Sequence, residues 1–255
     1  MEFAESFVEL NGCRTHLRRA GKGKPLLFLH GASGAPVIMP FMRTLAESFD
    51  VLVTEHPGYG RSGEPEWLEN IHDVAYFYLD FLKHLDLSEV VLVGSSMGGW
   101  MAAEIAVRDT SRLKSVVLVG PAGLSAPGVL PADIFLMPPE DMVRALFVDQ
   151  KLAEARLAEP VTPESIDAAL KNRHTTARLA WEPRLHDPHL AKWLHRIDVP
   201  VTIVWGEQDA ILPVGLAAEW RRHLPKARVE IIPRCGHLPH AETPDLFCDI
   251  VRKCR

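Results

Sequence analysis

The most informative segment of the sequence is Val90-Val91-Leu92-Val93-Gly94-Ser95-Ser96-Met97-Gly98-Gly99. Four β-branched and leucine residues predict a buried strand, and the pattern Gly-x-Ser-x-Gly follows the strand at once. The nearly all-apolar stretch from Trp100 to Val107 then predicts a helix buried in the middle of the molecule. Glycine is needed on both sides of such a tight turn, because bulk there would collide with the neighbouring strand or helix. The segment therefore predicts a nucleophilic Ser96 at the amino end of a helix, where developing negative charge is favoured.

Other apolar runs of strand length recur along the chain. They are Leu26 to Leu29, Val51 to Thr54, Val116 to Val119, Val201 to Trp205 and Val229 to Ile232. Such continuous runs are typical of strands covered on both faces, and the helical stretches between them indicate a mostly parallel sheet. Ser6 to Leu10 and Arg14 to Arg19 predict an antiparallel hairpin, because the intervening Asn11-Gly12 suits a type I′ turn. The predicted fold class is α/β, with a doubly wound sheet and an N-terminal hairpin.

Two helices carry clear start signals. Asn70 precedes an apolar stripe that begins at Ile71 and reaches Leu85, so Asn70 is the predicted N-cap of that helix. Near the end of the chain, Thr243 and Pro244 supply a predicted N-cap and first helical residue.

The alternation of strands and helices is interrupted between Pro121 and Pro200. This segment combines proline-rich turns with two amphipathic stretches, Asp141 to Val148 and Ser165 to Trp181, and contains no convincing strand. It is too long for a bare loop. We therefore predict a helical cap over residues 122–195, laid over the strand ends where open α/β sheets bind ligands. Residues 1–121 and 196–255 would form the core domain.

The composition excludes several classes of protein. The chain has 255 residues, 47% of them hydrophobic and 24% charged, which excludes disordered and collagen-like chains. A net charge of -5 gives no general attraction to nucleic acid or anionic lipid, so neither is a predicted partner. The four cysteines lack metal-site spacing, which predicts free thiols and no metal. No apolar run approaches the roughly 18 residues that span a bilayer, and the acidic start lacks the features of a secretion signal, so we expect a cytoplasmic protein.

Two further residues are predicted to act with Ser96. A serine hydroxyl needs a base, and His237 follows the last predicted strand on a loop that could reach Ser96. His240 is a rival on the same loop, but the glycine before His237 lets the backbone approach closely. Asp209 follows the preceding strand and would orient the imidazole. Glu207 competes for that role, although it precedes the turn and better suits a capping or solvated position.

A glycine-rich loop, His30-Gly31-Ala32-Ser33-Gly34, follows the predicted strand that ends at Leu29. Such a loop can aim a backbone N–H into a site at the strand end. Together with the N–H of Met97, the N–H of Ala32 would form a two-donor oxyanion hole. His30 is expected to brace this loop.

Taken together, these segments resemble the α/β-hydrolase superfamily over nearly the whole chain. The matching residues are His30-Gly31, Glu55-His56-Pro57-Gly58-Tyr59-Gly60-Arg61-Ser62, Gly94 to Gly99, Gly206-Glu207-Gln208-Asp209 and Gly236-His237. The resemblance implies Ser96, Asp209 and His237 as nucleophile, acid and base, in the family's chain order. It also implies Ala32 and Met97 as the oxyanion donors, a cap inserted after the sixth strand, and no cofactor. Glu55 replaces the family's usual aspartate in a segment that shapes a turn.

The residue at position 96 narrows the predicted activity. Haloalkane dehalogenases and epoxide hydrolases look similar but use a carboxylate at this position, so a serine excludes them. Meta-cleavage-product hydrolases, which split carbon–carbon bonds in dienoates, share the Ser-Met-Gly-Gly elbow. They typically carry tryptophan after the catalytic histidine and Gly-Pro-Gly in the oxyanion loop, whereas this chain has Leu238 and Gly31-Ala32-Ser33. The predicted activity is hydrolysis of small to medium apolar carboxylic esters through an acyl-enzyme. Carbon–carbon hydrolysis and a weakly hydrolytic ligand-binding protein are the alternatives.

An apolar substrate pocket is predicted around the site. The candidate lining residues are Phe135, Met137, Phe147, Trp181, Trp193, Leu212 and Leu238. Each of these side chains could instead pack within the cap or the core. Arg178 and Arg184 are cap cations that could meet a substrate carboxylate, although surface positions are the simpler expectation. The expected partner is a small ester or acyl substrate, and the expected assembly is a monomer or homodimer.

Overall fold

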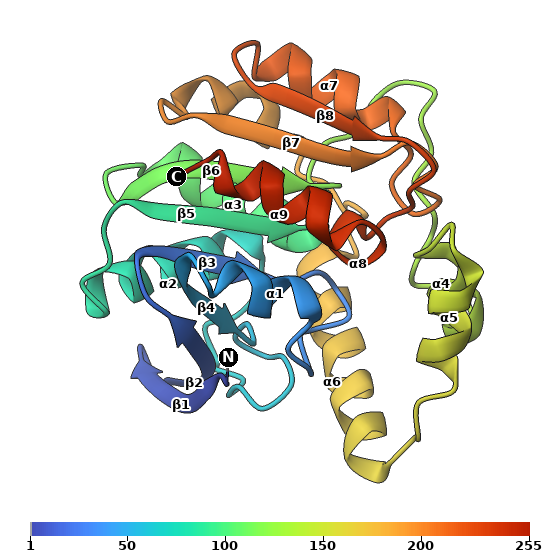
Figure 1. The fold of residues 1–255 in the computed structure, drawn as a ribbon, viewed down its shortest axis with the longest axis horizontal. Helices are drawn as coiled ribbons and strands as arrows, with labels where there is room; N and C mark the ends of the chain where they lie inside the picture. Colours follow the sequence, from blue (N-terminus) through green and yellow to red (C-terminus); the bar gives the residue numbers. More distant parts are fainter. Residues whose placement is uncertain (1) are drawn as a thin grey trace.

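An eight-stranded sheet runs through the computed structural model, which describes residues 2–255 (Figure 1). Its strands are β1 (Ala4–Leu10), β2 (Cys13–Gly21), β3 (Lys24–Leu29), β4 (Phe49–Thr54), β5 (Val90–Ser95), β6 (Leu113–Val119), β7 (Val201–Gly206) and β8 (Arg228–Ile232). Their order across the sheet is β1-β2-β4-β3-β5-β6-β7-β8. Strand β2 pairs antiparallel with β1 and β4, whereas the pairings from β4 to β8 are parallel. The predicted fold class is confirmed.

The opening hairpin turns where the sequence predicts it. Asn11 and Gly12 have φ of 51° and 73°, and Leu10 pairs directly with Cys13. Two consecutive positive φ angles are the signature of a type I′ turn, which asparagine and glycine accept at low cost.

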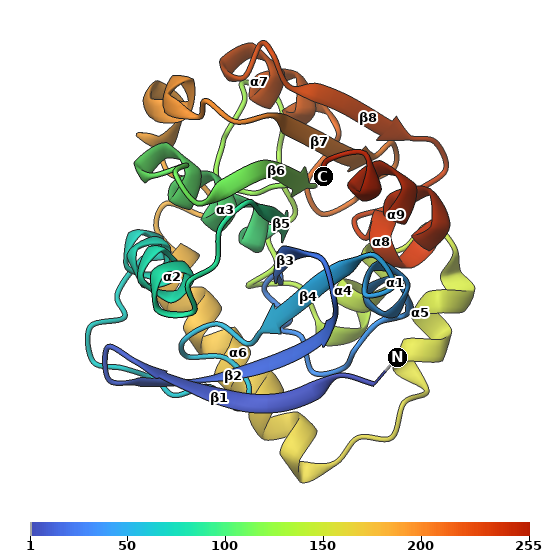
Figure 2. The same ribbon diagram turned by 60° about the vertical axis from the view of Figure 1, so that its left-hand side comes forward.

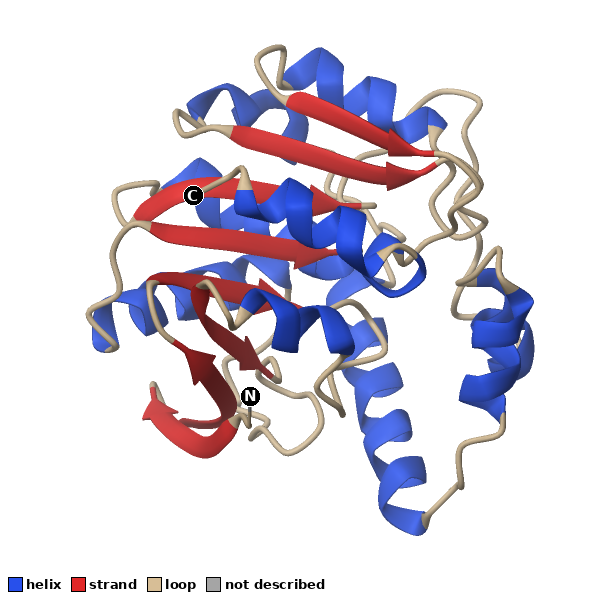
Figure 3. Cartoon of the chain, viewed as in Figure 1, coloured by secondary structure: helices blue, strands red, loops and turns tan. Residues whose placement is uncertain are grey.

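Side chains alternate between the two faces of the sheet, and each face is covered by helices (Figures 2 and 3). On one face lie α1 (Pro40–Leu45), α8 (Pro239–Glu242) and α9 (Pro244–Arg252). On the other face lie α2 (Ile71–His84), α3 (Met97–Arg108) and α7 (Gly215–His223). In β3, for example, Phe28 packs on the α1 and α9 side, whereas Leu27 and Leu29 pack on the α2 and α3 side. This two-sided burial explains why the strands are continuous apolar runs.

Helices α2 and α9 begin at the residues that the sequence predicts. Every residue of α3 from Met97 to Val107 is buried, as predicted. At α2, the Asn70 side chain accepts hydrogen bonds from the backbone N–H groups of His72 and Asp73, and the Asp73 carboxylate accepts one from the backbone N–H of Asn70. Thr243 is the N-cap of α9 and Pro244 its first residue, as predicted. The Thr243 hydroxyl makes no capping hydrogen bond and donates to the Pro239 carbonyl of the short helix α8 at 3.0 Å.

The segment between β6 and β7 is helical. It contains α4 (Pro139–Ala145), α5 (Gln150–Leu157), α6 (Pro163–Ala180) and the 3₁₀ helix η1 (Leu190–Arg196). Figure 1 shows α4, α5 and α6 beyond the arrowheads of the parallel strands, at the carboxyl edge of the sheet. Helix η1 packs instead against α3 and α7. We propose that α4, α5 and α6 form the cap and that the chain returns to the core before η1, somewhat earlier than residue 195.

Within the described residues, no helix combines the length and the apolar character needed to cross a bilayer.

Candidate active site

Ser96 stands on a strained turn between β5 and α3. Its φ of 56° and ψ of −118° form a combination that side chains rarely adopt. A Cβ at Gly94 would lie 2.2 Å from the Gly98 carbonyl oxygen, and a Cβ at Gly98 would lie 2.2 Å from the carbonyl oxygen of Leu29. Both flanking positions therefore require glycine, for the steric reason inferred from the spacing.

Asp209 and His237 are joined by a buried hydrogen bond. Asp209 follows β7 and His237 follows β8, and Oδ2 of the carboxylate lies 2.7 Å from Nδ1 of the imidazole. The other carboxylate oxygen accepts from the backbone N–H groups of Ile211 and Leu212, both at 2.9 Å. The backbone N–H of His237 donates to the Leu146 carbonyl at 3.0 Å. With Nδ1 bonded to a carboxylate, Nε2 is the nitrogen free to take a proton.

Ser96 and His237 line the same cavity, which has a volume of about 370 Å³. Ser96 is half-buried, whereas Asp209 lies behind His237 and outside the lining. The glycine-rich loop lies directly against the serine, since a Cβ at Gly31 would be 3.1 Å from the Ser96 Cβ and 3.7 Å from its Oγ. The structure thus brings together in one place segments that are separated along the chain.

The two amides predicted as oxyanion donors both border this cavity. Ala32 and Met97 are lining residues, and neither backbone N–H donates to an acceptor elsewhere in residues 2–255. Met97 is the first residue of α3, where helical N–H groups have no partner within the helix. Two free donors beside a serine hydroxyl can stabilise an oxyanion.

His30 braces the glycine-rich loop. Its Nδ1 lies 2.7 Å from the Gly31 carbonyl oxygen, and its Nε2 accepts the backbone N–H of His56 at 3.1 Å. The two imidazole rings also contact each other, with centroids 3.7 Å apart and planes tilted by 31°. Burial, assisted by His56, holds the pKa of His30 well below its usual value. A neutral imidazole bonded at both nitrogens serves structure, as the sequence analysis expects.

Glu207 and His240, the alternative acid and base considered from the sequence, take no part in the hydrogen bond between Asp209 and His237. Glu207 is exposed, and its carboxylate lies 3.4 Å from the backbone nitrogen of Arg234. His240 is buried in the cavity wall, and it is His237 that pairs with Asp209.

The model of the alpha/beta hydrolase family matches residues 26–250. The chain belongs to the alpha/beta hydrolase family. It is an enzyme of the hydrolase class, and its sheet topology agrees with that membership.

Proteins of similar sequence include two hydrolases of dienoates. This chain is 27% identical to 2-hydroxy-6-oxo-6-(2'-aminophenyl)hexa-2,4-dienoic acid hydrolase of Metapseudomonas resinovorans, over 97% of this chain and 89% of the relative. It is 26% identical to 2-hydroxy-6-oxo-6-phenylhexa-2,4-dienoate hydrolase of Burkholderia cepacia, over 93% of this chain and 90% of the relative.

Solved structures with the same fold include hydrolases of more than one kind. The naproxen esterase (carboxylesterase NP) of Bacillus subtilis superposes with a TM-score of 0.79 at 18% identity, covering 99% of this chain and 91% of that one. A serine hydrolase involved in carbazole degradation (CarC) superposes with a TM-score of 0.76 at 24% identity, covering 99% and 98%. At these identities the likeness shows the fold alone.

The predicted pocket residues of the hydrolase are divided by the fold. Phe147 and Leu238 line the cavity beside His237. Phe135 and Trp181 pack edge to face with ring centroids 5.2 Å apart, outside the lining. The structure places the others elsewhere. Met137 packs against the core, the Leu212 carbonyl accepts a hydrogen bond from the indole N–H of Trp205, and Trp193 of η1 lines a second cavity.

Both cap arginines considered for substrate binding are occupied by acidic partners. Arg178 lies 2.9 Å from the Glu64 carboxylate, and Arg184 pairs with Asp133. The cation that lines the cavity is Arg156 of α5, which the sequence analysis missed because α5 carries no strong apolar stripe. Lining residues 36–39, in the loop before α1, and Pro40 at the start of α1 were also missed, although the apolar run from Val37 to Met39 is a signal that could have shown them.

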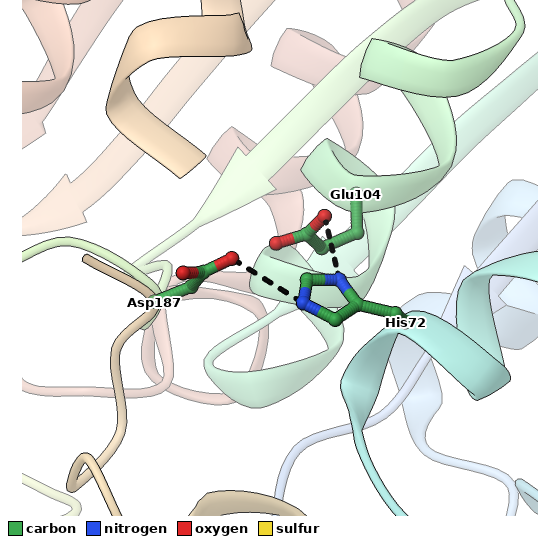
Figure 4. Close-up of side chains that lie close together, drawn as sticks. All are labelled: His72, Glu104 and Asp187. Atoms are coloured by element: carbon green, nitrogen blue, oxygen red, sulfur yellow. Dashed lines mark ion pairs between the residues drawn. The ribbon is translucent and has the colours of Figure 1, made fainter. Parts of the chain in front are cut away.

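A second cluster of titratable side chains lies away from this cavity (Figure 4). His72 of α2 stands between two carboxylates, with Nδ1 3.3 Å from Glu104 and Nε2 3.5 Å from Asp187. Arg108 bonds to the Glu104 carboxylate, and its Nη2 lies 2.8 Å from Nδ1 of His72. The positively charged guanidinium of Arg108, so close to the potential metal ligands His72 and Glu104, repels a metal cation. The cluster is therefore an ion-pair network that joins α2 and α3 to the chain returning from the cap.

Proposed function

We propose that this hydrolase cleaves small to medium apolar carboxylic esters through a covalent acyl-enzyme on Ser96. One observation carries the proposal. Ser96 and a carboxylate-oriented His237 open into the same cavity, beside the unused amides of Ala32 and Met97.

The proposed reaction uses only these groups and water. Nε2 of His237 takes the proton of Ser96 Oγ as the oxygen attacks the ester carbonyl, and the amides of Ala32 and Met97 hold the oxyanion. His237 then gives its proton to the leaving alcohol. A water then loses a proton to His237 and attacks the acyl-enzyme, and His237 returns that proton to Ser96 Oγ as the acid is released. Asp209 keeps the imidazole oriented and stabilises its protonated form.

The cavity lining favours an apolar substrate. The cap contributes Met142, Leu146, Phe147 and Leu152, and the core contributes Ile211 and Leu238. A volume of about 370 Å³ is at the small end of ligand sites and suits a small or medium ester.

A second candidate function is carbon–carbon bond hydrolysis of ring-fission dienoates. The dienoate hydrolases among the relatives of this chain favour it. Against it stand Leu238, where that subfamily typically carries tryptophan, and the absence of a Gly-Pro-Gly run in the glycine-rich loop.

One set of assays separates the candidates. We expect 4-nitrophenyl esters graded by acyl length to be turned over with a higher kcat/KM than a ring-fission dienoate. The opposite order would establish the carbon–carbon reaction. A fluorophosphonate probe should label the wild type and leave Ser96→Ala unlabelled, and a wild type without label would refute an attacking serine.

A further inference from the structure

A buried imidazole that the proposed reaction does not use lies in the wall of the active-site cavity. His240 of α8 is 4% exposed and lines the cavity. Its side chain makes no hydrogen bond with another group of residues 2–255, and its Nδ1 is enclosed without any partner. Buried polar atoms are satisfied in the great majority of cases, so this exception asks for an explanation.

The surroundings of His240 keep it uncharged. The rings of Phe28, Phe41 and Phe247 lie with centroids 5.8, 4.9 and 5.7 Å from its own. Burial, with a smaller contribution from His237, lowers the pKa of His240 to about 3. A neutral imidazole forms no ion pair, so His240 itself would supply no counter-ion to a carboxylate placed against it. The ligand group that suits this position is uncharged.

The enclosed nitrogen also indicates which hydrogen-bonding role is available. An N–H sealed from every acceptor is among the rarest unsatisfied groups in folded proteins, so the proton belongs on Nε2. Because Nδ1 is enclosed while the ring lines the cavity, Nε2 is the atom that a ligand can reach. The imidazole then offers one hydrogen-bond donor within a largely apolar wall.

We propose that His240 forms a subsite that donates a hydrogen bond to an uncharged acceptor oxygen of the substrate. The oxygen would be a ketone carbonyl or an ether, separate from the ester group that Ser96 attacks. This inference rests on the proposed ester hydrolysis and specifies its substrate class as oxygen-bearing esters. A substrate with a methylene in place of that oxygen leaves the His240 N–H unpaired. An unpaired buried donor discriminates between two substrates more strongly than the size of an apolar pocket does.

The test compares matched esters in the wild type and in His240→Leu. One series places the oxygen in the acyl chain (4-nitrophenyl 4-oxopentanoate and 5-oxohexanoate against the pentanoate and hexanoate). The other series places the oxygen in the alcohol (2-methoxyethyl against butyl esters of one acid). The measured quantity is the ratio of kcat/KM between oxygenated and plain ester, divided by the same ratio for His240→Leu. This quotient cancels differences in intrinsic reactivity.

We expect the quotient to reach about 3 to 10 in at least one series, mainly through KM. His240→Gln keeps an N–H donor and should retain part of the preference, whereas His240→Phe suits the aromatic surroundings and should lose it. These two variants also replace His240→Leu if that protein does not fold. Quotients near 1 in both series, with folded variants, overturn the subsite.

Failure of the proposed function would look different. No ester would then be turned over and no fluorophosphonate label would appear. Calorimetric titration of Ser96→Ala with ethyl 5-oxohexanoate and ethyl hexanoate, with and without His240→Leu, measures the same preference without turnover. Tighter binding of the keto ester that disappears with His240→Leu supports the subsite, and equal binding of both esters refutes it.

Discussion

At the scale of single residues, the candidate site depends on a few positions that have no freedom to vary. Ser96 keeps a rarely adopted backbone conformation because Gly94 and Gly98 allow β5, α3 and β3 to touch there. Strain of this kind costs about 1–3 kcal/mol and persists only where the surrounding structure holds it. The strained residue is thus the one to which chemistry is assigned.

Removing either reacting side chain should abolish turnover while the fold remains. Ser96→Ala and His237→Ala are each expected to lose at least about 10³ in kcat, because attack then lacks its nucleophile or its base. Steady-state kinetics and thermal melts check both statements. His189→Ala, which alters an exposed histidine, should keep wild-type kcat. Substantial turnover by Ser96→Ala or His237→Ala would refute the assignment.

Gly120 offers a more selective test of the Asp209–His237 pair. Its φ is +46°, and an added Cβ would lie 3.3 Å from Oδ2 of Asp209 and 3.5 Å from Nδ1 of His237. Gly120→Ala should therefore lower kcat and also cost about 1 kcal/mol of stability. Gly128→Ala is the matched control, because Gly128 has a φ of +76° with nothing within 4 Å of its Cβ position. It should lose similar stability with kcat unchanged; equal kcat in both variants would contradict the expectation.

At the scale of elements, helix α6 of the cap holds the loops of the core. Nδ2 of Asn172 donates to the Ser33 carbonyl at 3.0 Å, and its Oδ1 accepts the Gly60 N–H at 2.9 Å. The Thr176 hydroxyl donates to the Ala32 carbonyl at 3.3 Å. The loop that carries one proposed oxyanion donor is therefore held in place by a helix inserted far along the chain.

Removing the Asn172 hydrogen bonds to the core loops should lower kcat more than it changes KM. Asn172→Ala is expected to lower kcat by about 10-fold with a smaller change in KM, because the Ala32 amide would be less well placed for the transition state. Asn70→Ala provides a control, since losing the α2 cap should cost about 1 kcal/mol, or roughly 2–4 °C in Tm, without changing kcat. If the two variants show the same kcat, α6 does not position the loop.

At the scale of the whole molecule, an ion-pair network joins separate parts of the fold. It consists of His72, Glu104 and Asp187 (Figure 4), together with Arg108. His72 comes from α2 and Glu104 from α3, while Asp187 follows the cap. The hydrogen bond to Glu104 raises the pKa of His72. A raised pKa in the folded state means that the protonated histidine stabilises the fold.

This linkage predicts a pH-dependent role for His72. Its contribution should be fully present below the unfolded pKa of about 6.5 and should be lost as the pH rises through the higher folded pKa. The difference in Tm between the wild type and His72→Gln should accordingly be larger near about pH 6 than near about pH 9. Thermal melts across this range measure it. A constant difference would show that His72 stabilises the fold without its charge.

Much of the fold and part of the site could be read from contiguous residues. The strand-turn-helix around Ser96, the type I′ hairpin and the start of α2 each depend on neighbours within a few positions, so local sterics and burial periodicity suffice to predict them. The cap is predicted only from an interruption of that pattern, and the earlier boundary that we propose for it rests on the packing of η1 against α3 and α7.

The rest depends on contacts between distant segments. Residues 209 and 237 approach each other only because β7 and β8 are adjacent parallel strands, and their hydrogen bond does not follow from either segment alone. The cavity lining was the least predictable part: Phe147 faces it, whereas Trp181 turns toward Phe135. Apolar side chains bury themselves wherever neighbouring elements leave space, and that space is created only when the helices of the cap pack onto the core.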